Sequence, residues 1–336
     1  MFRKLQNIKY YSVLALFVLL LAVGGMIAFI GRSELPEGPS DDFVKRAQSR
    51  TVVVPLPRKL DFAGENVPLN LFYVREALDR ELTLNTYWHS QSLLLFKRAN
   101  RFFPVIEPIL RDHNIPDDFK YIVLVESGFL HNVSPAGAAG YWQFLKETAQ
   151  EYGLEVSATV DERYHLEKST HAVGRFLKKS FEKYGNWTVV AASFNGGMGR
   201  FDRIVKSQKT TNYYEMYMNP ETSRYIFRIL AFKLIFEHPE KYGYFLKKEE
   251  LYPRIRTKTL EINQNIPDLP GFASGQGISY RMLRELNPWI NDTQLVVKPG
   301  KTYKILLPVG NYTEYDELVR EEVNGKTTEN ETRNEP

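Results

Sequence analysis

The sequence predicts a mainly α fold, with one large helical domain followed by a small C-terminal α+β module. Between residues 70 and 245, apolar residues recur with the helical period of about 3.6, and no run of alternating strands stands out. Residues 250–310 contain two short strand-like segments with two short helical segments between them. A chain of 336 residues is long enough for one or two domains with an ample core.

The composition excludes several classes of chemistry. The chain has no cysteine, which excludes disulfides, thiolate catalysis, zinc–thiolate sites and an acylated cysteine anchor. Its six histidines show no metal-binding spacing, so we expect neither a metal site nor a cofactor. The formal net charge of +4 is mild and no basic stripe occurs, so we expect no nucleic-acid partner. A weak attraction to an anionic polymer or a membrane surface is compatible with this charge.

Residues 1–32 predict a membrane segment. Several basic residues precede an uncharged run from Tyr10 to Ile30, which is close in length to the ~20 residues of a bilayer span. The basic residues favour a cytoplasmic N-terminal end, so we expect the chain from about residue 33 onward to lie outside the cytoplasm. We expect an uncleaved signal-anchor formed by about residues 10–30, with a cleaved signal peptide as the alternative.

Two further segments look poorly suited to a core. Residues 33–69 contain five prolines separated by polar residues, which is typical of an extended tether. Residues 311–336 contain eight acidic and three basic residues and few apolar ones. Such a composition buries too little apolar surface to offset the entropy of ordering, so we expect a disordered acidic tail.

The clearest helices lie in the second half of the predicted helical domain. Val173 and Leu177 lie on one apolar face of a helix that Gly185 should end. Another helix should begin at residues 220–222 and end at Pro239.

Residues 250–310 predict a strand–helix–helix–strand unit. Residues 260–262 and 303–307 have strand character, and residues 268–273 and 279–286 have helical character. Two interpretations stay open for this segment: an independent small module, or a C-terminal cap on the helical domain.

A carboxylate occupies an unusual position in the helix entered at residues 114–117. Phe119, Ile122 and Glu126 fall at positions i, i+3 and i+7, so Glu126 lies on the stripe that should face the core. Burial there would raise the pKa of its carboxyl group, and a carboxylic acid that keeps its proton near neutral pH suits the general acid of glycosidic cleavage. The ordinary alternative is a helix-end glutamate that turns toward water.

The turn after Glu126 carries side chains that suit a sugar. It is rich in glycine and alanine at residues 137–140, where another chain can approach closely. Hydroxyl and amide groups around it can bind sugar hydroxyls, and aromatic rings can stack on pyranose faces. A tight interhelical turn with a buried tryptophan explains the same residues. The candidate residues are Ser127, Ser134, Tyr141, Trp142 and Gln143.

Four ordered motifs then resemble those of a known enzyme family. They are Glu126-Ser127, Gly140-Tyr141-Trp142-Gln143, Ser193-Phe194-Asn195 and Tyr225. They are similar to the motifs of goose-type-lysozyme-like lytic transglycosylases, and particularly to the membrane-bound lytic murein transglycosylase D group. Phe194 stands where the third motif usually has Tyr, and Arg224 sits one place late in the fourth. The resemblance extends over about residues 70–245.

The resemblance implies a lysozyme-like catalytic domain with Glu126 as the sole acid and base. Ser134 is then expected to hydrogen-bond near Glu126 and the reacting sugar, and Tyr225 to help position Glu126. Gln143 and Asn195 are expected to hold the substrate. Without the resemblance, Asn195 would be interpreted as part of a turn and Tyr225 as helix packing. The other expected substrate contacts are Ser127, Tyr141, Trp142 and Phe194.

The resemblance also implies the substrate and the reaction. The substrate is expected to be the glycan strands of peptidoglycan, cut at the β-1,4 bond between N-acetylmuramic acid and N-acetylglucosamine. Glu126 would protonate the bridging oxygen and then take the proton of the muramyl C6 hydroxyl, which closes on C1 as a 1,6-anhydro end.

Ordinary glycosidases need two carboxylates, about 5–5.5 Å or about 6.5–9.5 Å apart. No second acid stands in the motif region, and an internal nucleophile removes the need for one. Asp161-Glu162 is the nearest acidic pair and is expected to cap or salt-bridge a helix start.

The C-terminal module resembles a degenerate LysM repeat in residues 278–288 and 299–308, so a glycan-holding role is expected. The resemblance places the protein in the bacterial cell envelope, on the periplasmic face of the inner membrane if residues 10–30 are an anchor, or soluble in the periplasm if they are cleaved.

Two other functions stay open. One is a lysozyme-like hydrolase in which water attacks, and the other is a non-catalytic scaffold that binds the cell wall.

Overall fold

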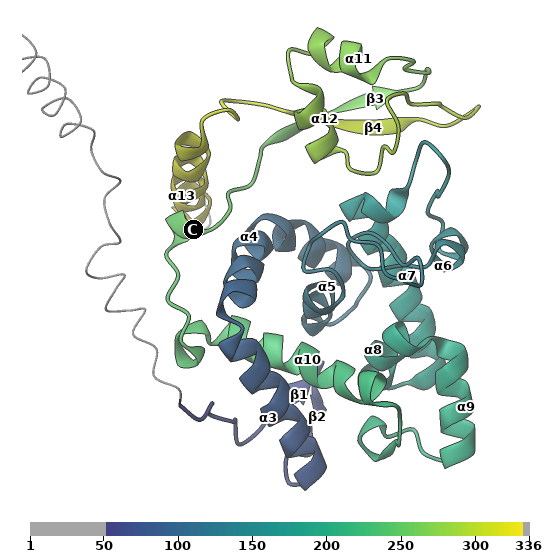
Figure 1. Cartoon of the computed structure of the whole chain (residues 1–336), viewed down its shortest axis with the longest axis vertical. Helices are drawn as coiled ribbons and strands as arrows, with labels where there is room; N and C mark the ends of the chain where they lie inside the picture. Colours follow the sequence, from purple (N-terminus) through teal and green to yellow (C-terminus); the bar gives the residue numbers. More distant parts are fainter. Residues whose placement is uncertain (1–51, 332–336) are drawn as a thin grey trace, which may run out of the picture. The chain divides into compact units, whose positions relative to one another are not determined.

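The computed structural model describes residues 52–331, and its compact unit begins at Val54 (Figure 1). The predicted membrane segment, residues 1–32, lies outside the described residues. Within the described part, none of the helices combines the length and the apolar character needed to span a membrane.

The end of the predicted tether belongs to the core, so that prediction was wrong for its last residues. Strands β1 (Asp61–Phe62) and β2 (Glu65–Asn66) form a short antiparallel hairpin. Phe62 is fully buried, and Val67 and Leu69 are buried beside it in the main core. Prolines restrict the chain to extended conformations but do not prevent the apolar residues between them from packing.

Helices make up most of residues 72–250. These residues and the β1–β2 hairpin are together called the helical body below. Helix α10 packs against α3, α5 and α8, while α7 packs against α4 and α8. The long helices are α3 (Phe72–Tyr87), α4 (His89–Asp112), α7 (Leu166–Tyr184), α8 (Trp187–Gly196), α9 (Met198–Gln208) and α10 (Pro220–Glu237). The short helices are η1 (Asp117–Tyr121), α5 (Ile122–Glu126), α6 (Lys146–Glu151), η2 (Glu162–Tyr164), η3 (Tyr213–Glu215), η4 (Pro239–Tyr242) and η5 (Lys248–Glu250).

The two predicted helix boundaries are confirmed. Helix α7 ends at Gly185, whose φ of 62° lies in the left-handed region that glycine enters without a steric penalty. Helix α10 begins at Pro220, and the Asn219 side chain caps it by accepting a hydrogen bond from the Thr222 N–H.

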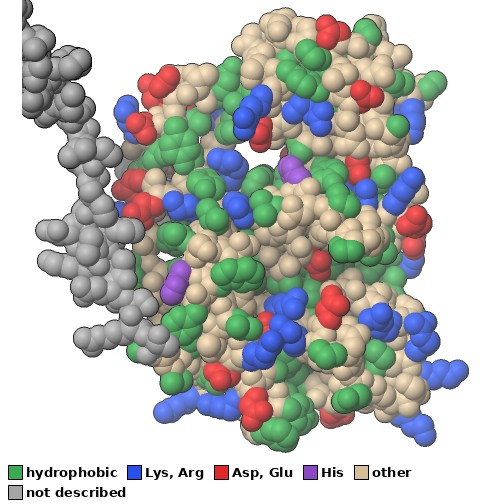
Figure 2. Space-filling model, viewed as in Figure 1, with side chains coloured by type: hydrophobic (Ala, Val, Ile, Leu, Met, Phe, Trp, Pro, Cys, Tyr) green, Lys and Arg blue, Asp and Glu red, His purple; other side chains and the backbone are tan. Residues whose placement is uncertain are grey.

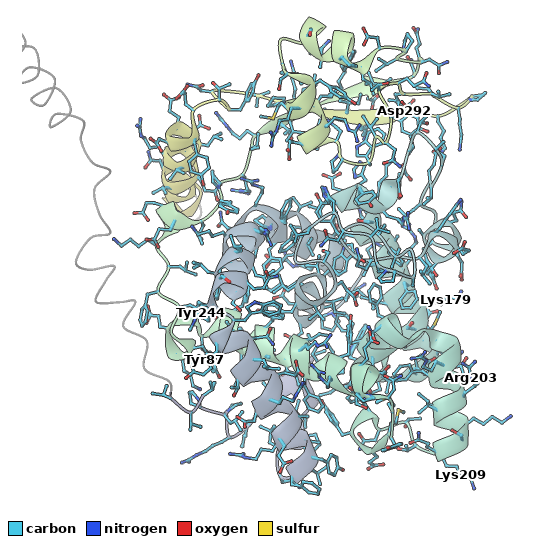
Figure 3. All side chains as sticks on the ribbon, in the orientation of Figure 1. Tyr87, Lys179, Arg203, Lys209, Tyr244 and Asp292 are labelled. Carbon is cyan, nitrogen blue, oxygen red and sulfur yellow. The ribbon has the colours of Figure 1, made fainter. Side chains whose placement is uncertain are left out.

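Tyr244 fixes the sharp corner between α3 and α4 (Figure 3). Its hydroxyl lies within hydrogen-bonding distance of the carbonyl oxygens of Asn85, at 3.1 Å, and Thr86, at 2.8 Å. The Ser92 hydroxyl donates to the same Asn85 oxygen at 2.7 Å. The chain can therefore bend sharply between two long helices without leaving the carbonyls of Asn85 and Thr86 unpaired.

The strand–helix–helix–strand prediction for the C-terminal module is confirmed. Strands β3 (Thr257–Ile262) and β4 (Tyr303–Pro308) pair antiparallel, and helices α11 (Leu269–Gly275) and α12 (Tyr280–Leu286) lie between them in the sequence. The module has a hydrophobic core of its own, centred on residues such as Leu283. The mainly α fold with a small α+β module is thus confirmed.

The module is also docked on the helical body, so both interpretations of this segment hold in part. Val160 of the body is fully buried in the core of the module and forms a β-bridge with Ile290. The main chain continues the contact, because the Asn291 N–H donates to the Thr159 oxygen at 2.9 Å and the Asp161 N–H donates to the Trp289 oxygen at 2.8 Å. These contacts are called the junction below.

The tail that the sequence predicts to be disordered forms helix α13 (Tyr315–Glu331), so the prediction was wrong for this segment. Leu318 is buried, and two ion pairs hold the helix to the chain before β3. The pairs are Arg254–Glu322 at 3.2 Å and Arg256–Glu321 at 2.8 Å. Two of the acidic residues in the composition that suggested disorder, Glu321 and Glu322, are thus paired with arginines that lie far away in the sequence.

Candidate active site

Glu126 lies at the C-terminal end of α5, beneath α10. The predicted register is confirmed, because Phe119 and Ile122 on the same stripe are fully buried. Glu126 itself keeps partial exposure, as the last helical residue before the turn. The short helix therefore places one carboxyl group at the rim of the core, with one side toward solvent.

Tyr225 on α10 is bonded directly to this carboxyl group. Its hydroxyl donates to Oε1 of Glu126 at 2.6 Å, and the tyrosine side chain is 1% exposed. No protein group within residues 52–331 hydrogen-bonds Oε2, and that atom is not sealed from solvent. One carboxyl oxygen is thus held by the protein and the other is accessible to a substrate.

The electrostatics favour the protonated form of Glu126. Burial raises the pKa of its carboxyl group to about 7, while the Tyr225 hydrogen bond and the positive charge of Arg228 partly offset that rise. The negative charge of Glu221, an exposed residue in the first turn of α10, raises the pKa further. A glutamic acid with this pKa can both donate and accept a proton near neutral pH.

A buried ion cluster beside the site was missed by the sequence analysis. Glu81 on α3 is 2% exposed and accepts a hydrogen bond from Nε of Arg224 at 2.7 Å. Nε of Arg228 lies 3.6 Å from its other oxygen, so Glu81 offsets the positive charge that lowers the pKa of Glu126. The signal that finds Glu126 would also have found Glu81, because it lies three residues after Leu78 on a buried stripe.

The two serines of the turn bind main chain. The Ser127 hydroxyl donates to the Tyr141 oxygen at 2.6 Å and accepts from the Phe129 N–H at 3.1 Å. The Ser134 hydroxyl accepts from the Ala138 N–H at 3.0 Å. Ser127 therefore joins the end of α5 to the glycine-rich turn, whereas Ser134 closes that turn and keeps its own proton for another partner.

Gly140 and Gln143 give the turn its shape. A Cβ atom on Gly140 would lie 2.0 Å from the Arg163 carbonyl oxygen, so this position requires glycine. Gln143 has a φ of 52°, and its Nε2 donates to the carbonyl oxygens of Asn132 at 3.0 Å and Gly140 at 2.9 Å. The amide oxygen of Gln143 has no hydrogen-bond donor elsewhere in residues 52–331.

Arg163 holds the same turn from below. Its Nη1 donates to the Gly137 oxygen at 2.9 Å and to the Phe144 oxygen at 3.1 Å. Its Nη2 lies 2.6 Å from Asp161, which also caps η2 by accepting from the Arg163 N–H. The predicted capping and ion-pair role is confirmed for Asp161, whose carboxylate is occupied by the helix cap and by Arg163.

The predicted stacking platform at Tyr141 and Trp142 needs correction. Trp142 is fully buried and donates its Nε1–H to Oγ1 of Thr170 at 3.0 Å, and Tyr141 is 4% exposed. Neither ring presents a face to solvent. A tryptophan next to a glycine-rich turn fills the core under that turn because its large apolar ring gains most when it is buried.

The third motif lies at the C-terminal end of α8, which packs on α10. Phe194 is half-buried and packs edge-on against Phe144 and Phe176, with ring centroids 5.8 Å and 5.3 Å away. Asn195 is also half-buried, and its side-chain amide makes no hydrogen bond with any other part of residues 52–331. Its amide is therefore free to bind a substrate.

No cluster of three or more potential metal ligands occurs in the described part of the chain.

The fold and this geometry agree with two domain families. Residues 104–217 match the family described as transglycosylase SLT domain, and residues 258–311 match the soluble lytic transglycosylase C-terminal LysM-like domain. The chain therefore contains an SLT transglycosylase domain followed by a LysM-like domain. The first match includes Glu126 and Asn195 but ends before Tyr225, so Tyr225 is connected to the site by the fourth motif and by its hydrogen bond to Glu126.

Curated relatives point to one group within this class. The membrane-bound lytic murein transglycosylase D of Escherichia coli (strain K12) is 28% identical over 176 residues, which are 51% of this chain and 38% of that protein. The protein of the same name from Escherichia coli O6:H1 gives the same values. The resemblance predicted from the four motifs is confirmed, and the chain spans 38% of the length of these relatives.

Proposed function

We propose that this protein is a peptidoglycan lytic transglycosylase. It cleaves the β-1,4 bond between N-acetylmuramic acid and N-acetylglucosamine without water and leaves 1,6-anhydromuramyl ends. The observation that carries the proposal is the half-buried carboxyl group of Glu126, with a pKa of about 7 and one oxygen held by Tyr225. The SLT domain match and the transglycosylase relatives support the same reaction class.

In this mechanism Glu126 acts twice. Its protonated Oε2 donates to the bridging oxygen as the bond to C1 of the muramyl sugar breaks. The resulting carboxylate then takes the proton of the C6 hydroxyl of the same sugar, and that oxygen bonds to C1. Glu126 ends protonated, as it began, and no water is consumed. The attack is intramolecular, with an effective molarity on the order of 10⁵ M or more when well oriented.

Tyr225 is a positioning residue in this scheme. Its hydrogen bond fixes Oε1, so the proton is exchanged through the accessible oxygen. The hydrogen bond also stabilises the carboxylate between the two steps, which keeps the pKa from rising above the range where both steps proceed.

The substrate is proposed to lie along the turn and the end of α8. The free amide of Asn195 and the amide oxygen of Gln143 provide a donor–acceptor set for the acetamido groups of the sugars. The unused proton of Ser134 and the partly exposed ring of Phe194 add a polar and an apolar contact. Ser127, Tyr141 and Trp142 support this surface from beneath.

We place the protein in the bacterial cell envelope, facing the periplasm, with about residues 10–30 as an inner-membrane anchor. The apolar run in the sequence supports the anchor. Fractionation of cells tests it: the full chain should stay with the inner membrane after a salt wash, whereas release into the periplasmic fraction would show that the segment is cleaved.

Product analysis tests the activity. Purified peptidoglycan sacculi are digested with the parent protein or with Glu126→Gln, and the soluble products are identified by mass spectrometry. The parent should release fragments with anhydromuramyl ends and the variant should release none. Glu151→Gln, an exposed surface change, is the control for handling. Products with only reducing ends would overturn the proposal, and wall binding without cleavage would favour the scaffold.

A hydrolase is the second candidate, because the negative charge of Glu221 is among the influences that raise the pKa of Glu126. An exposed second carboxylate could activate a water in an inverting reaction. Glu221→Gln separates the two readings, since it should abolish cleavage by a hydrolase but leave transglycosylation largely intact.

A further inference from the structure

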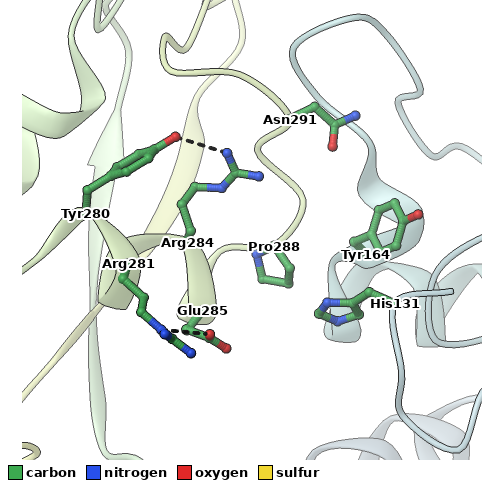
Figure 4. A pocket seen from close by; sticks show the side chains of 8 residues that line it. All are labelled: His131, Tyr164, Tyr280, Arg281, Arg284, Glu285, Pro288 and Asn291. Carbon is green, nitrogen blue, oxygen red and sulfur yellow. Dashed lines mark hydrogen bonds and ion pairs between the residues drawn. The ribbon is translucent and has the colours of Figure 1, made fainter.

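A cleft of about 560 Å³ lies where the C-terminal module meets the turn that follows Glu126 (Figure 4). His131 and Tyr164 line it from the helical body, and the residues of α12 line it from the module. Lys and Arg side chains gather around the hollow beneath the module (Figure 2). The volume falls in the range of about 300–1,000 Å³ typical of small-ligand sites, and none of the catalytic steps uses this cleft.

Arg284 is the strongest feature of the cleft. Its Nη1 donates to the Tyr280 hydroxyl at 3.1 Å and lies 3.5 Å from the Asp292 carbonyl oxygen. Its Nη2 makes no hydrogen bond within residues 52–331 and, unlike the buried Nε, is not sealed from solvent, and no ion pair in that range involves this arginine. A guanidinium group with unused donors and no carboxylate partner is well suited to bind an anionic oxygen.

The other charges in the cleft do not neutralise Arg284. Nε of Arg281 and Oε1 of Glu285 are 3.6 Å apart, with side chains 88% and 62% exposed. An ion pair this exposed contributes little to stability, but its two opposite charges cancel within the lining. Arg284 is then the half-buried cation that leaves the lining with a net positive charge (Figure 4).

The opposite wall offers uncharged rings. His131 packs edge-on against Tyr164 and Tyr141, with ring centroids 5.4 Å and 5.1 Å away. Burial lowers the pKa of His131, and the negative charge of Glu285 opposes that fall only in part, so its imidazole is neutral at neutral pH. A neutral imidazole and a phenol ring can hydrogen-bond sugar hydroxyls and contact a sugar face without repelling Arg284's ligand.

We propose that this junction cleft binds a carboxylate-bearing segment of a glycan, with the carboxylate on Arg284 and the sugar against His131 and Tyr164. The inference rests on the proposed function for the identity of the glycan. Because His131 follows Glu126 by only five positions, a strand held here is anchored to the same turn that shapes the catalytic site. The docked module then acts by completing a binding site, not by binding glycan alone.

Binding experiments on the full chain test this site. In these experiments the Glu126→Gln protein serves as the parent into which each variant is introduced, so that no probe is cleaved. Three short glycan probes are compared by calorimetry: one with free sugar carboxylates, one with peptides attached to them, and one with the carboxylates reduced to alcohols. Arg284→Gln should weaken binding of a carboxylated probe about tenfold, as expected for a hydrogen bond to a charged group. It should leave the reduced probe unchanged.

Arg281→Glu is the second variant, because its exposed side chain makes no contribution to packing. It should weaken the same carboxylated probe and spare the reduced one. The probe that responds identifies whether the carboxylate belongs to the sugar or to the peptide. Equal affinities of both variants and the parent for all three probes would overturn the inference. If the wild-type protein also fails to cleave sacculi, the proposed function fails with it; if cleavage persists, only the cleft assignment fails.

Discussion

Two glutamates show how the active site and the contact between the helical body and the module use the same side chain differently. Burial is the largest influence on both Glu126 and Glu155, and it acts to raise the pKa of each. Yet the pKa of Glu126 is raised to about 7, whereas that of Glu155 is lowered to about 2 by hydrogen bonds from Lys298, Lys301 and Tyr303. The number of cationic donors in contact decides which effect wins.

The two environments suit two tasks. Lys298 lies 2.7 Å from one oxygen of Glu155, and the Tyr303 hydroxyl donates to the other at 2.9 Å, so Glu155 is a fixed anion that joins the body to the module. Glu126 has one neutral donor, and the nearby Arg228 is shared with Glu81. A carboxyl group can exchange protons near neutral pH only where such cations are kept away.

The largest expected effect is that of Glu126→Gln on cleavage. The amide keeps the size of the side chain and cannot donate or accept the catalytic proton. Cleavage of sacculi should fall by at least about 10²–10⁴-fold. The matched change Glu155→Gln should leave the rate of the chemical step close to wild type. Equal losses in the two variants would contradict the division of roles.

Tyr225→Phe should lower kcat about tenfold and change its pH dependence. A general acid is lost as pH rises through its pKa, so activity should decline above about pH 7 in the wild type. Removing the hydrogen bond that lowers this pKa should move the decline to higher pH. Tyr213→Phe is the control, since its buried hydroxyl bonds main-chain oxygens of Thr222 and Ser223 and should leave the profile in place.

Glu81→Gln should move the decline of activity with rising pH in the opposite direction, to lower pH. With Glu81 neutral, the charge of Arg228 is no longer offset, so the pKa of Glu126 should fall and activity should decline at lower pH. The variant should also lose about 1–3 kcal/mol of stability, because Arg224 keeps a partly buried charge without its partner. Glu107→Gln, which removes a different ion pair, should leave the pH profile unchanged.

Thermal unfolding should show opposite effects of the two glutamates on stability near neutral pH. A carboxyl group with a lowered pKa stabilises the fold above its unfolded pKa of about 4.5, and this contribution is lost as pH falls toward about 2. Glu155→Gln should therefore lower the Tm at pH 7, which corresponds to a loss of roughly 1–2 kcal/mol in the free energy of unfolding. The difference in Tm between variant and wild type should vanish in acid. Glu126→Gln should be neutral or stabilising at pH 8, because the native carboxylate is disfavoured there.

The sequence was sufficient for features that depend on local spacing. The 3.6-residue stripe that carries Glu126, the end of α7 at Gly185 and the four elements of the module all follow from residues close together in the chain. The predictions for the tether and the tail failed because the packing of these segments depends on distant residues. Phe62 and Leu318 are buried by partners distant in sequence, and a local composition count contains no information on such partners.

The site shows the same limit. Glu126 and Tyr225 are 99 positions apart, and only the crossing of α5 by α10 brings them to 2.6 Å. The platform at Trp142 was misassigned because an aromatic ring beside a glycine turn suits a sugar face and a core equally well. The junction cleft could not be predicted, since His131 and Arg284 are distant in the sequence and line one cleft only because the module is docked on the helical body.

In the proposed mechanism one carboxyl group performs the whole reaction with an oxygen from the sugar itself. Digestion of sacculi in water enriched in heavy oxygen distinguishes this oxygen from that of water. We expect the wild-type protein to release anhydromuramyl ends that contain no heavy oxygen, and Glu126→Gln to release no such ends. Heavy oxygen at the new muramyl ends would show that water is the nucleophile and would rule out the transglycosylase mechanism.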